Sequence, residues 1–274
     1  MNRKTLIRRL FIAVFFAVIL FSFIICIRAG RSSGEIYKNF SEEEAEKEIL
    51  FYQDHVFTSK DTFVRVVGNR VVINRGGTYL LRGDFDDGQI VVDVGKDEEV
   101  KLKLQGLSIR CRDSAPLYVR RAKKVTLKLK DGSENSLSDT ASDREDGTKA
   151  CVYADSDLTI KGEGALTVKG SLRHGIFSTK DLKIRSGRLT VKAVRQALHG
   201  KKSVLIDGGS HKLKAGTDGV HSNGELTISS CKLEIDARKY GMYAYSGIHV
   251  DKKTARVQVR HALSEAGCQG GIDY

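Results

Sequence analysis

The sequence predicts an all-β protein, a right-handed single-stranded parallel β-helix with three sheets, preceded by an N-terminal transmembrane helix. Two observations predict the β-helix: short runs of alternating apolar and polar residues, and the return of these runs about every 22 residues. A third observation, an uncharged apolar stretch near the amino terminus, predicts the membrane segment. The 27 glycines and single proline of the 274-residue chain agree with many tight turns and no Pro-rich linker.

The apolar stretch covers residues 10–27 and contains 18 residues without a charge. As a helix it would be about 27 Å long, close to the roughly 30 Å of a bilayer core. Arg3, Lys4, Arg8 and Arg9 precede it, so we expect residues 1–9 to be cytoplasmic and the C-terminal domain to be extracellular. This predicts a single-pass cell-membrane protein. The alternative is a signal that is cleaved, leaving a secreted protein.

Residues 28–60 are expected to form a linker and a short capping helix. Ser41 and Glu44 have the spacing of a capping box, which predicts a helix over about 42–53. Such a helix would cover the first coil of the solenoid, whose edge would otherwise stay unpaired.

Residues 61–274 carry the repeat. The runs DLKI, SVLI, ELTI and GIHV begin at Asp181, Ser203, Glu225 and Gly247, each 22 residues after the last. Units of this length with several short strands and no helical stretch are typical of a β-solenoid. Ankyrin and tetratricopeptide repeats need helices, and propeller blades are about twice as long.

The charge balance excludes some classes of partner. With 46 Lys and Arg against 34 Asp and Glu the net charge is +12, and residues 1–40 contribute 7 − 1 = +6 of it. The basic residues of the remaining chain are expected outside the cell and form no nucleic-acid motif, so we expect no nucleic acid partner. The five cysteines form no C-x-x-C pair, which excludes common zinc and redox motifs. We expect a monomer.

Basic side chains should form columns on two sheets. In a DLTI-type strand the Leu and Ile point inward and the residues between them point outward. One sheet then presents Lys128, Lys161, Lys183 and Arg185, and a second presents Lys169, Lys192, Lys212 and Lys214 before turning acidic at Glu234 and Asp236. Like charges stacked at about 4.8 Å repel unless anions lie between them. These columns therefore favour an anionic polymer as ligand, although lysines also keep a sheet face soluble.

The third sheet should present a column of rings, one per coil. These are Tyr118, Tyr153, Phe177, His199, His221 and Tyr243. Sugar rings pack their apolar faces on such side chains, so the column is a candidate carbohydrate-binding site. The alternative is a ladder of rings that only stabilises the solenoid.

Several segments resemble a known family. The runs GGTYLLRGDFDDGQIVVDVGKDEEVKLKL, YADSDLTIKGEGALTVKG, HGIFSTKDLKIRSGRLTVKA and GTDGVHSNGELTI are similar to the carbohydrate-binding parallel β-helix family of bacterial surface proteins. That family was formerly a domain of unknown function, and it includes clostridial surface proteins that bind polygalacturonate and cellulose. The resemblance covers roughly residues 64–250. It implies a pectate-lyase-like fold, calcium binding and binding of acidic plant polysaccharide, without demonstrated cleavage.

The sequence departs from the family at the expected calcium ligands. The family repeats a G-D-G-I element, but the corresponding column here reads His174, Gln196, Asp218 and Tyr240, so only Asp218 is a candidate metal ligand. Calcium is thus implied by the resemblance and weakened by the lost aspartates. The acids between Asp131 and Asp146 are interpreted as a solvated loop.

Three functions follow as hypotheses. The first is a membrane-anchored extracellular protein that binds acidic polysaccharide of the polygalacturonate type and is not a catalyst. The alternative is a structural or adhesion solenoid that binds anionic wall polymers by charge. A pectate-lyase-like polysaccharide lyase is a third, for which Arg185 and Arg188 are candidate bases, but the aspartate cluster that such enzymes place beside the base is missing.

Overall fold

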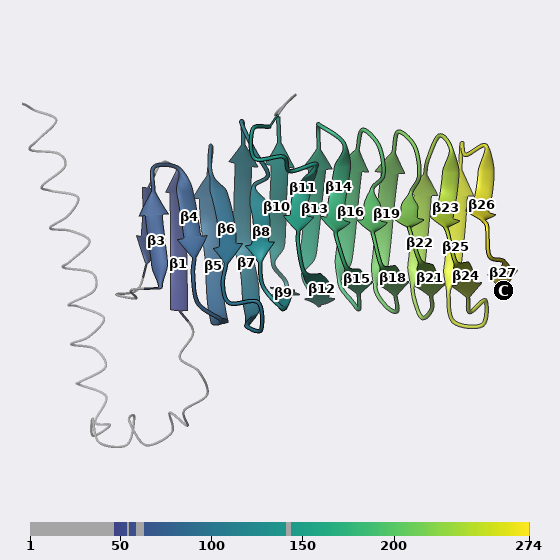
Figure 1. The fold of residues 1–274 in the computed structure, drawn as a ribbon, viewed down its shortest axis with the longest axis horizontal. Helices are drawn as coiled ribbons and strands as arrows, with labels where there is room; N and C mark the ends of the chain where they lie inside the picture. The colour runs from purple at the N-terminus through teal and green to yellow at the C-terminus, as the bar shows by residue number, and fades with distance from the viewer. Residues whose placement is uncertain (1–46, 54, 59–62, 141–143, 274) are drawn as a thin grey trace, which may run out of the picture. The chain divides into compact units, whose positions relative to one another are not determined.

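The computed structural model describes residues 47–53, 55–58, 63–140 and 144–273, and every regular element in these ranges is a β-strand. None of the described segments is a helix that is long and apolar enough to cross a membrane. The predicted anchor, residues 10–27, and the cytoplasmic segment 1–9 lie outside the described residues. The strands stack side by side along one axis, from β1 and β3 at one end to β26 and β27 at the other (Figure 1).

The strands form three parallel ladders, as predicted, in a solenoid of about eight turns. The first ladder contains β5 (Gly77–Phe85), β7 (Glu99–Cys111), β9 (Lys124–Leu129), β12 (Asp157–Gly162), β15 (Asp181–Ile184), β18 (Ser203–Ile206), β21 (Glu225–Ile228), β24 (Gly247–Val250) and β27 (Ile272–Asp273). The second runs from the carboxyl half of β7 through β10 (Glu134–Asp139), β13 (Ala165–Gly170), β16 (Arg188–Ala193), β19 (Ser210–Ala215), β22 (Lys232–Asp236) and β25 (Arg256–Arg260).

The third ladder contains β4 (Arg70–Ile73), β6 (Gln89–Asp93), β8 (Leu117–Arg121), β11 (Ala150–Ala154), β14 (His174–Ser178), β17 (Leu198–Gly200), β20 (Val220–Ser222), β23 (Tyr240–Ala244) and β26 (Ser264–Cys268). The final segment, which is weakly patterned in sequence, therefore completes all three ladders through β25, β26 and β27. No loop slips the register, because a slip by one residue would turn each apolar column toward solvent.

The core lies inside the solenoid and is built from the predicted inward columns. Leu158 pairs with Leu182, which continues through Val204, and all three side chains are fully buried or nearly so. Burial of this kind contributes about 25 cal/mol per Å² of apolar surface removed from water. The repeat thus specifies both the ladders and the core.

The amino-terminal end differs from the prediction. Lys47–Gln53 form strand β1, not the carboxyl half of a helix, and β1 pairs in parallel with β5. Ile49 and Phe51 alternate with more exposed neighbours and are buried in the core, so pairing with β5 outweighs the local helical pattern. β2 (His55–Thr58) and β3 (Val64–Val67) fold back antiparallel on β1 and β4. These two hairpins end the solenoid, which therefore begins before residue 61.

The acidic segment after Asp131 is also more ordered than predicted. Residues 134–139 form β10, and Asp139 and Arg144 form an ion pair of 2.5 Å whose side chains are completely buried. Ser171 donates its backbone N–H to Asp139 at 2.6 Å, and Arg144 donates to the carbonyl of Ala150 at 2.6 Å. The interpretation as a solvated loop is wrong for these residues, which anchor the segment to the core.

Candidate functional site

The predicted ring column is present on the third ladder. The register places Tyr118, Tyr153, Phe177, His199, His221 and Tyr243 opposite one another on successive strands. Successive ring centroids lie 5.6, 5.1, 4.9, 4.7 and 4.8 Å apart in that order. The rings therefore touch all along the column.

The middle of this column is covered. Phe177 is only 4% exposed, and His174 stacks on it at 5.5 Å. Burial lowers the pKa of His174 to about 3 and that of His199 to about 4, so both imidazoles are neutral at neutral pH. The central rings thus act as packing, and a ligand could reach the column at its ends.

One end of the column opens into a hollow of about 600 Å³. It lies beside β20 and β23 and is lined by Asp218, His221, Asn223, Lys239, Tyr240, Tyr243 and Tyr245. Tyr240 packs 5.4 Å from Tyr243, while Tyr245 is 56% exposed. We call these seven residues the tyrosine hollow. It combines apolar rings with an amide and an ammonium, which suits a ligand that is itself both apolar and polar.

A hydrogen-bond network fixes the floor of the tyrosine hollow. Asp218, only 3% exposed, accepts from His221 Nδ1 at 2.8 Å and from Gln196 Nε2 at 3.2 Å. Burial acts to raise the pKa of Asp218, but these two hydrogen bonds outweigh it and hold the pKa below its ordinary value. The carboxylate is therefore charged and orients His221.

A second pair extends this network. His199 Nε2 lies 2.9 Å from Asn223 Oδ1, which holds the amide of Asn223 at the rim of the hollow. Buried atoms without a hydrogen-bond partner among the described residues gather here, namely His174 Nδ1, Gln196 Oε1, His199 Nδ1, Thr217 Oγ1 and Asp218 Oδ1. Buried polar groups rarely stay unpaired in folded proteins. The concentration of such atoms therefore marks this region as a site for polar ligands.

The column around Asp218 does not fit calcium. Calcium takes six to eight oxygen ligands, several of them carboxylates. Here the neighbouring positions are His174, Gln196 and Tyr240, and the one carboxylate already accepts from two nitrogen donors. The set of donors favours hydrogen bonding over calcium coordination.

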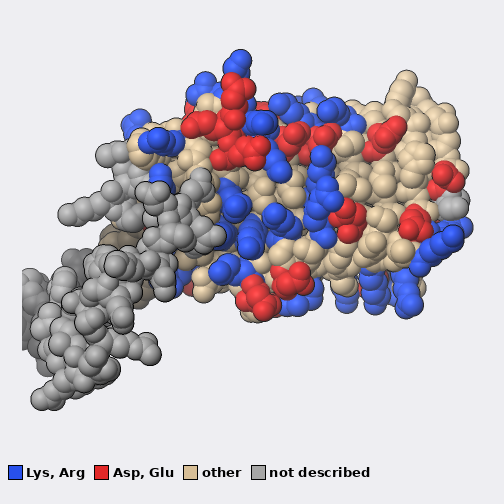
Figure 2. Space-filling model, turned by 90° about the horizontal axis from the view of Figure 1, so that it is seen from below, with Lys and Arg blue, Asp and Glu red and all other residues tan. Residues whose placement is uncertain are grey.

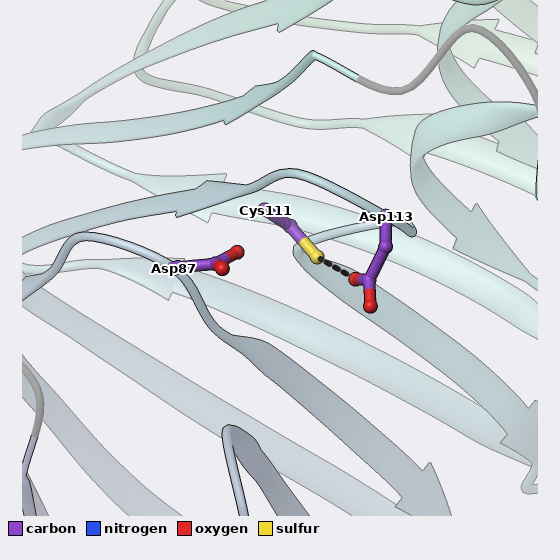
Figure 3. Close-up of side chains that lie close together, drawn as sticks. All are labelled: Asp87, Cys111 and Asp113. Carbon is purple, nitrogen blue, oxygen red and sulfur yellow. Dashed lines mark hydrogen bonds between the residues drawn. The ribbon is translucent and has the colours of Figure 1, made fainter.

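Asp87, Cys111 and Asp113 form another group that could hold a metal, with ligand atoms within 4.8 Å of one another (Figure 3). Asp87 already accepts from the backbone N–H of Arg112 at 3.0 Å, and Cys111 Sγ lies 3.5 Å from Asp113. Burial raises the pKa of Cys111 to about 12, which disfavours the thiolate that binds metals. This group, which the sequence did not suggest, is therefore a poor metal site.

The predicted basic residues are placed by the structure on two different ladders. On the first ladder Lys161 pairs with Lys128, but Arg185 forms an ion pair with Asp207 at 2.5 Å, and Lys183 lies 3.7 Å from Asp181. Arg188 lies 3.2 Å from Glu134. The charges of Lys183, Arg185 and Arg188 are thus largely compensated within the protein.

The second ladder bears a basic groove. An open groove of about 410 Å³ runs over β13, β16, β19 and β22, and Lys169, Lys192 and Lys214 stand in register along it. Lys214 lies 3.6 Å from Asp236, whereas Lys169 and Lys192 have no acidic partner among the described residues. On the face seen in Figure 2, Lys and Arg gather in patches along the solenoid with Asp and Glu between them. We call the groove the lysine groove.

The sequence therefore indicated the ring column and His221, Tyr243 and Asp218, but not the hollow itself. Asn223, Lys239 and Tyr245 lie in turns outside the strands and follow no period. One sign was available: the column of His174, Gln196 and Asp218 ends at Tyr240, three residues before Tyr243.

Comparisons with known proteins agree with this architecture. The family model described as carbohydrate-binding domain-containing protein matches residues 67–269. A carbohydrate-binding domain-containing protein of Acetivibrio thermocellus is 39% identical over 158 residues, 56% of this chain and 55% of that protein, so the match spans about half of the relative. The solved structure of the polysaccharide lyase-like protein from C. thermocellum, a gadolinium derivative, is similar with a TM-score of 0.77 and 33% identity over 84% of this chain and 96% of that one. The resemblance found in the sequence is confirmed.

Proposed function

Because this chain belongs to the family of carbohydrate-binding domain-containing proteins, we propose that it binds acidic polysaccharide of the polygalacturonate type in the tyrosine hollow. The solenoid would be exposed on the outer face of the cell membrane, held by residues 10–27. A secreted form, produced by cleavage after that segment, is the alternative.

The observation that carries the proposal is the composition of the hollow. Tyr240, Tyr243 and Tyr245 offer ring faces on which sugar rings can pack, and Asn223 and Lys239 offer N–H groups at its rim. Lys239 Nζ lies 5.1 Å from the Tyr240 ring, close to the surface where a stacked sugar would lie. A uronate adds a carboxylate to each sugar, and charge-assisted hydrogen bonds to such a group are about twice as strong as neutral ones.

Affinity electrophoresis or calorimetry of the full-length chain in detergent tests this proposal. Polygalacturonate is expected to bind, and neutral galactan of the same length to bind more weakly. Tyr245→Ala removes an exposed ring, and we expect a loss of about 0.5–1.5 kcal/mol, or roughly 2- to 13-fold in affinity. Tyr52→Ala is the matched control, because Tyr52 is 67% exposed on β1, away from the hollow. Equal effects of the two variants would contradict the proposed site.

The membrane anchor has a separate test. Full-length chain is expected in the membrane fraction, resistant to high salt and accessible to protease from outside the cell. A chain lacking residues 1–28 should be recovered in the soluble fraction. Recovery of the unaltered chain in the medium would favour the secreted form.

The lysine groove favours a second candidate function, attraction of anionic wall polymers by charge. Stacked ammonium groups repel one another, and an anionic polymer lying along Lys169 and Lys192 would relieve that repulsion. Binding of this kind falls steeply with ionic strength. Lys169→Gln with Lys192→Gln should weaken it and leave the tyrosine hollow intact.

A further inference from the structure

Beyond binding, the tyrosine hollow holds side chains suited to proton transfer. His221 Nδ1 lies 2.8 Å from Asp218 Oδ2, and the carboxylate of Asp218 can only accept a hydrogen bond. The proton of a neutral His221 must therefore sit on Nδ1, which leaves the lone pair on Nε2. Gln196 holds the other side of the pair by donating to the same oxygen of Asp218 at 3.2 Å. This arrangement fixes His221 as a base.

Two groups at the rim could neutralise an acid group on the ligand. Asn223 Oδ1 is occupied by His199 Nε2 at 2.9 Å, so its amide N–H₂ is directed elsewhere, and the residue is exposed at the hollow. Lys239 adds an ammonium without an acidic partner among the described residues. A uronate carboxylate bound by these two groups would make the neighbouring C5–H more acidic, because they stabilise the negative charge that develops when the proton leaves.

A proton donor stands beside the base. The ring of Tyr243 stacks on His221 with centroids 4.8 Å apart and an angle of 22° between the planes, and both rings line the hollow. The phenolic O–H of Tyr243 can donate a proton to a leaving oxygen. Base, acid and carboxylate-binding groups thus come from two successive coils, β20 with its flanking turns and β23.

We propose that the tyrosine hollow cleaves 4-linked uronate polymers by β-elimination without a metal ion, with His221 as base and Tyr243 as acid. This inference rests on the proposed function, because the ligand must be a uronate. His221 Nε2 takes the C5 proton, and the electrons of the C5–H bond form a C4=C5 double bond. The C4–O4 bond breaks, and the leaving oxygen takes the proton of Tyr243. The products are an alcohol end and a 4,5-unsaturated uronate, with no oxidant or reductant consumed. Asp218 is a positioning residue.

The test is incubation of full-length chain with polygalacturonate and, separately, with alginate, in excess chelator. Product is measured by the ultraviolet absorbance of the unsaturated uronate and by mass. His221→Gln is expected to lower kcat by about 100-fold or more. Asp218→Asn should lower kcat with little change in KM, since it acts through His221. Tyr243→Phe, which removes a single oxygen, is the second catalytic variant in case His221→Gln does not fold.

The matched control is His261→Gln. His261 Nδ1 lies 3.0 Å from Asp236, a similar pair that is exposed and lies on the second ladder, so its loss should leave cleavage unchanged. Unsaturated product that disappears in His221→Gln and Tyr243→Phe but persists in chelator supports the inference. Polymer that binds wild-type protein without yielding product overturns the inference but not the proposed function, whereas failure to bind overturns both. Cleavage that needs a metal, or that survives His221→Gln, also overturns it.

Discussion

The buried ion pair between Asp139 and Arg144 should control the stability of the solenoid. Replacing Arg144 with Met removes the guanidinium that lies 2.5 Å from Asp139 and leaves a carboxylate whose side chain is completely buried. Breaking a buried pair from one side costs about 3–5 kcal/mol, because one charge stays behind without its partner. This is a large part of the roughly 5–15 kcal/mol that stabilises a typical domain.

The pH dependence of Arg144→Met has a defined sign. Burial raises the pKa of Asp139 above its ordinary value, and Arg144 opposes this rise, so the variant should raise the pKa further. A carboxyl with a raised pKa in the folded state binds its proton more readily when folded. Stability should therefore increase as the pH falls from neutral toward the ordinary carboxyl range, and be lost again as the pH rises.

Urea unfolding followed by far-ultraviolet circular dichroism measures both effects. The double variant Asp139→Asn with Arg144→Met removes both charges and keeps an oxygen for the Ser171 N–H, so it should be more stable than Arg144→Met alone. A loss below about 1 kcal/mol in the single variant, or additive losses in the double variant, would refute the reasoning.

Three further predictions concern backbone, histidine and surface charge. Gly162→Ala should destabilise strongly, because φ is +113° and a Cβ would lie 2.1 Å from the Leu129 carbonyl oxygen, whereas Gly106→Ala (φ +68°, open space) should cost only about 1 kcal/mol; chemical denaturation compares them. His174→Gln should flatten the fall in unfolding free energy between pH 7 and 5, because the pKa of His174 is lowered to about 3 and wild-type stability is lost as the unfolded histidine takes up a proton; a slope equal to that of wild type would contradict this. Lys192→Gln should reduce the salt dependence of binding to polyphosphate or another anionic polymer with no loss in thermal stability, as measured by titration at two ionic strengths.

Much of the fold can be predicted because one constraint is repeated in every coil. Leu182, Val204 and Leu226 occupy the same inward position in successive coils, and a period of 22 residues fixes their register. The outward ring column follows from the same register. A solenoid is in this sense nearly one-dimensional, so a pattern found in one coil holds for its neighbours.

The end of the solenoid has no such repetition. The segment containing Glu48, Ile49 and Phe51 reads equally well as an amphipathic helix, and only pairing with β5 decides for a strand. Asp139 and Arg144 were missed for a related reason, since nothing local marks a charged side chain as buried. Long-range contacts decide such residues.

The candidate site was predicted in part. His221 and Tyr243 belong to the periodic column, so their side-by-side placement follows from the repeat. Asn223, Lys239 and Tyr245 lie in turns, whose geometry varies from coil to coil. The column also proved too buried at Phe177 to serve along its whole length as a sugar platform, because His174 covers it.

Hydrogen exchange of the full-length chain, with and without saturating polygalacturonate, tests the central claim most directly. If the tyrosine hollow holds the polymer, peptides covering 217–223 and 238–246 should exchange more slowly in its presence, and this protection should persist at high salt. Protection confined to the lysine groove on β13, β16 and β19, or no protection anywhere at saturating polymer, would contradict the account.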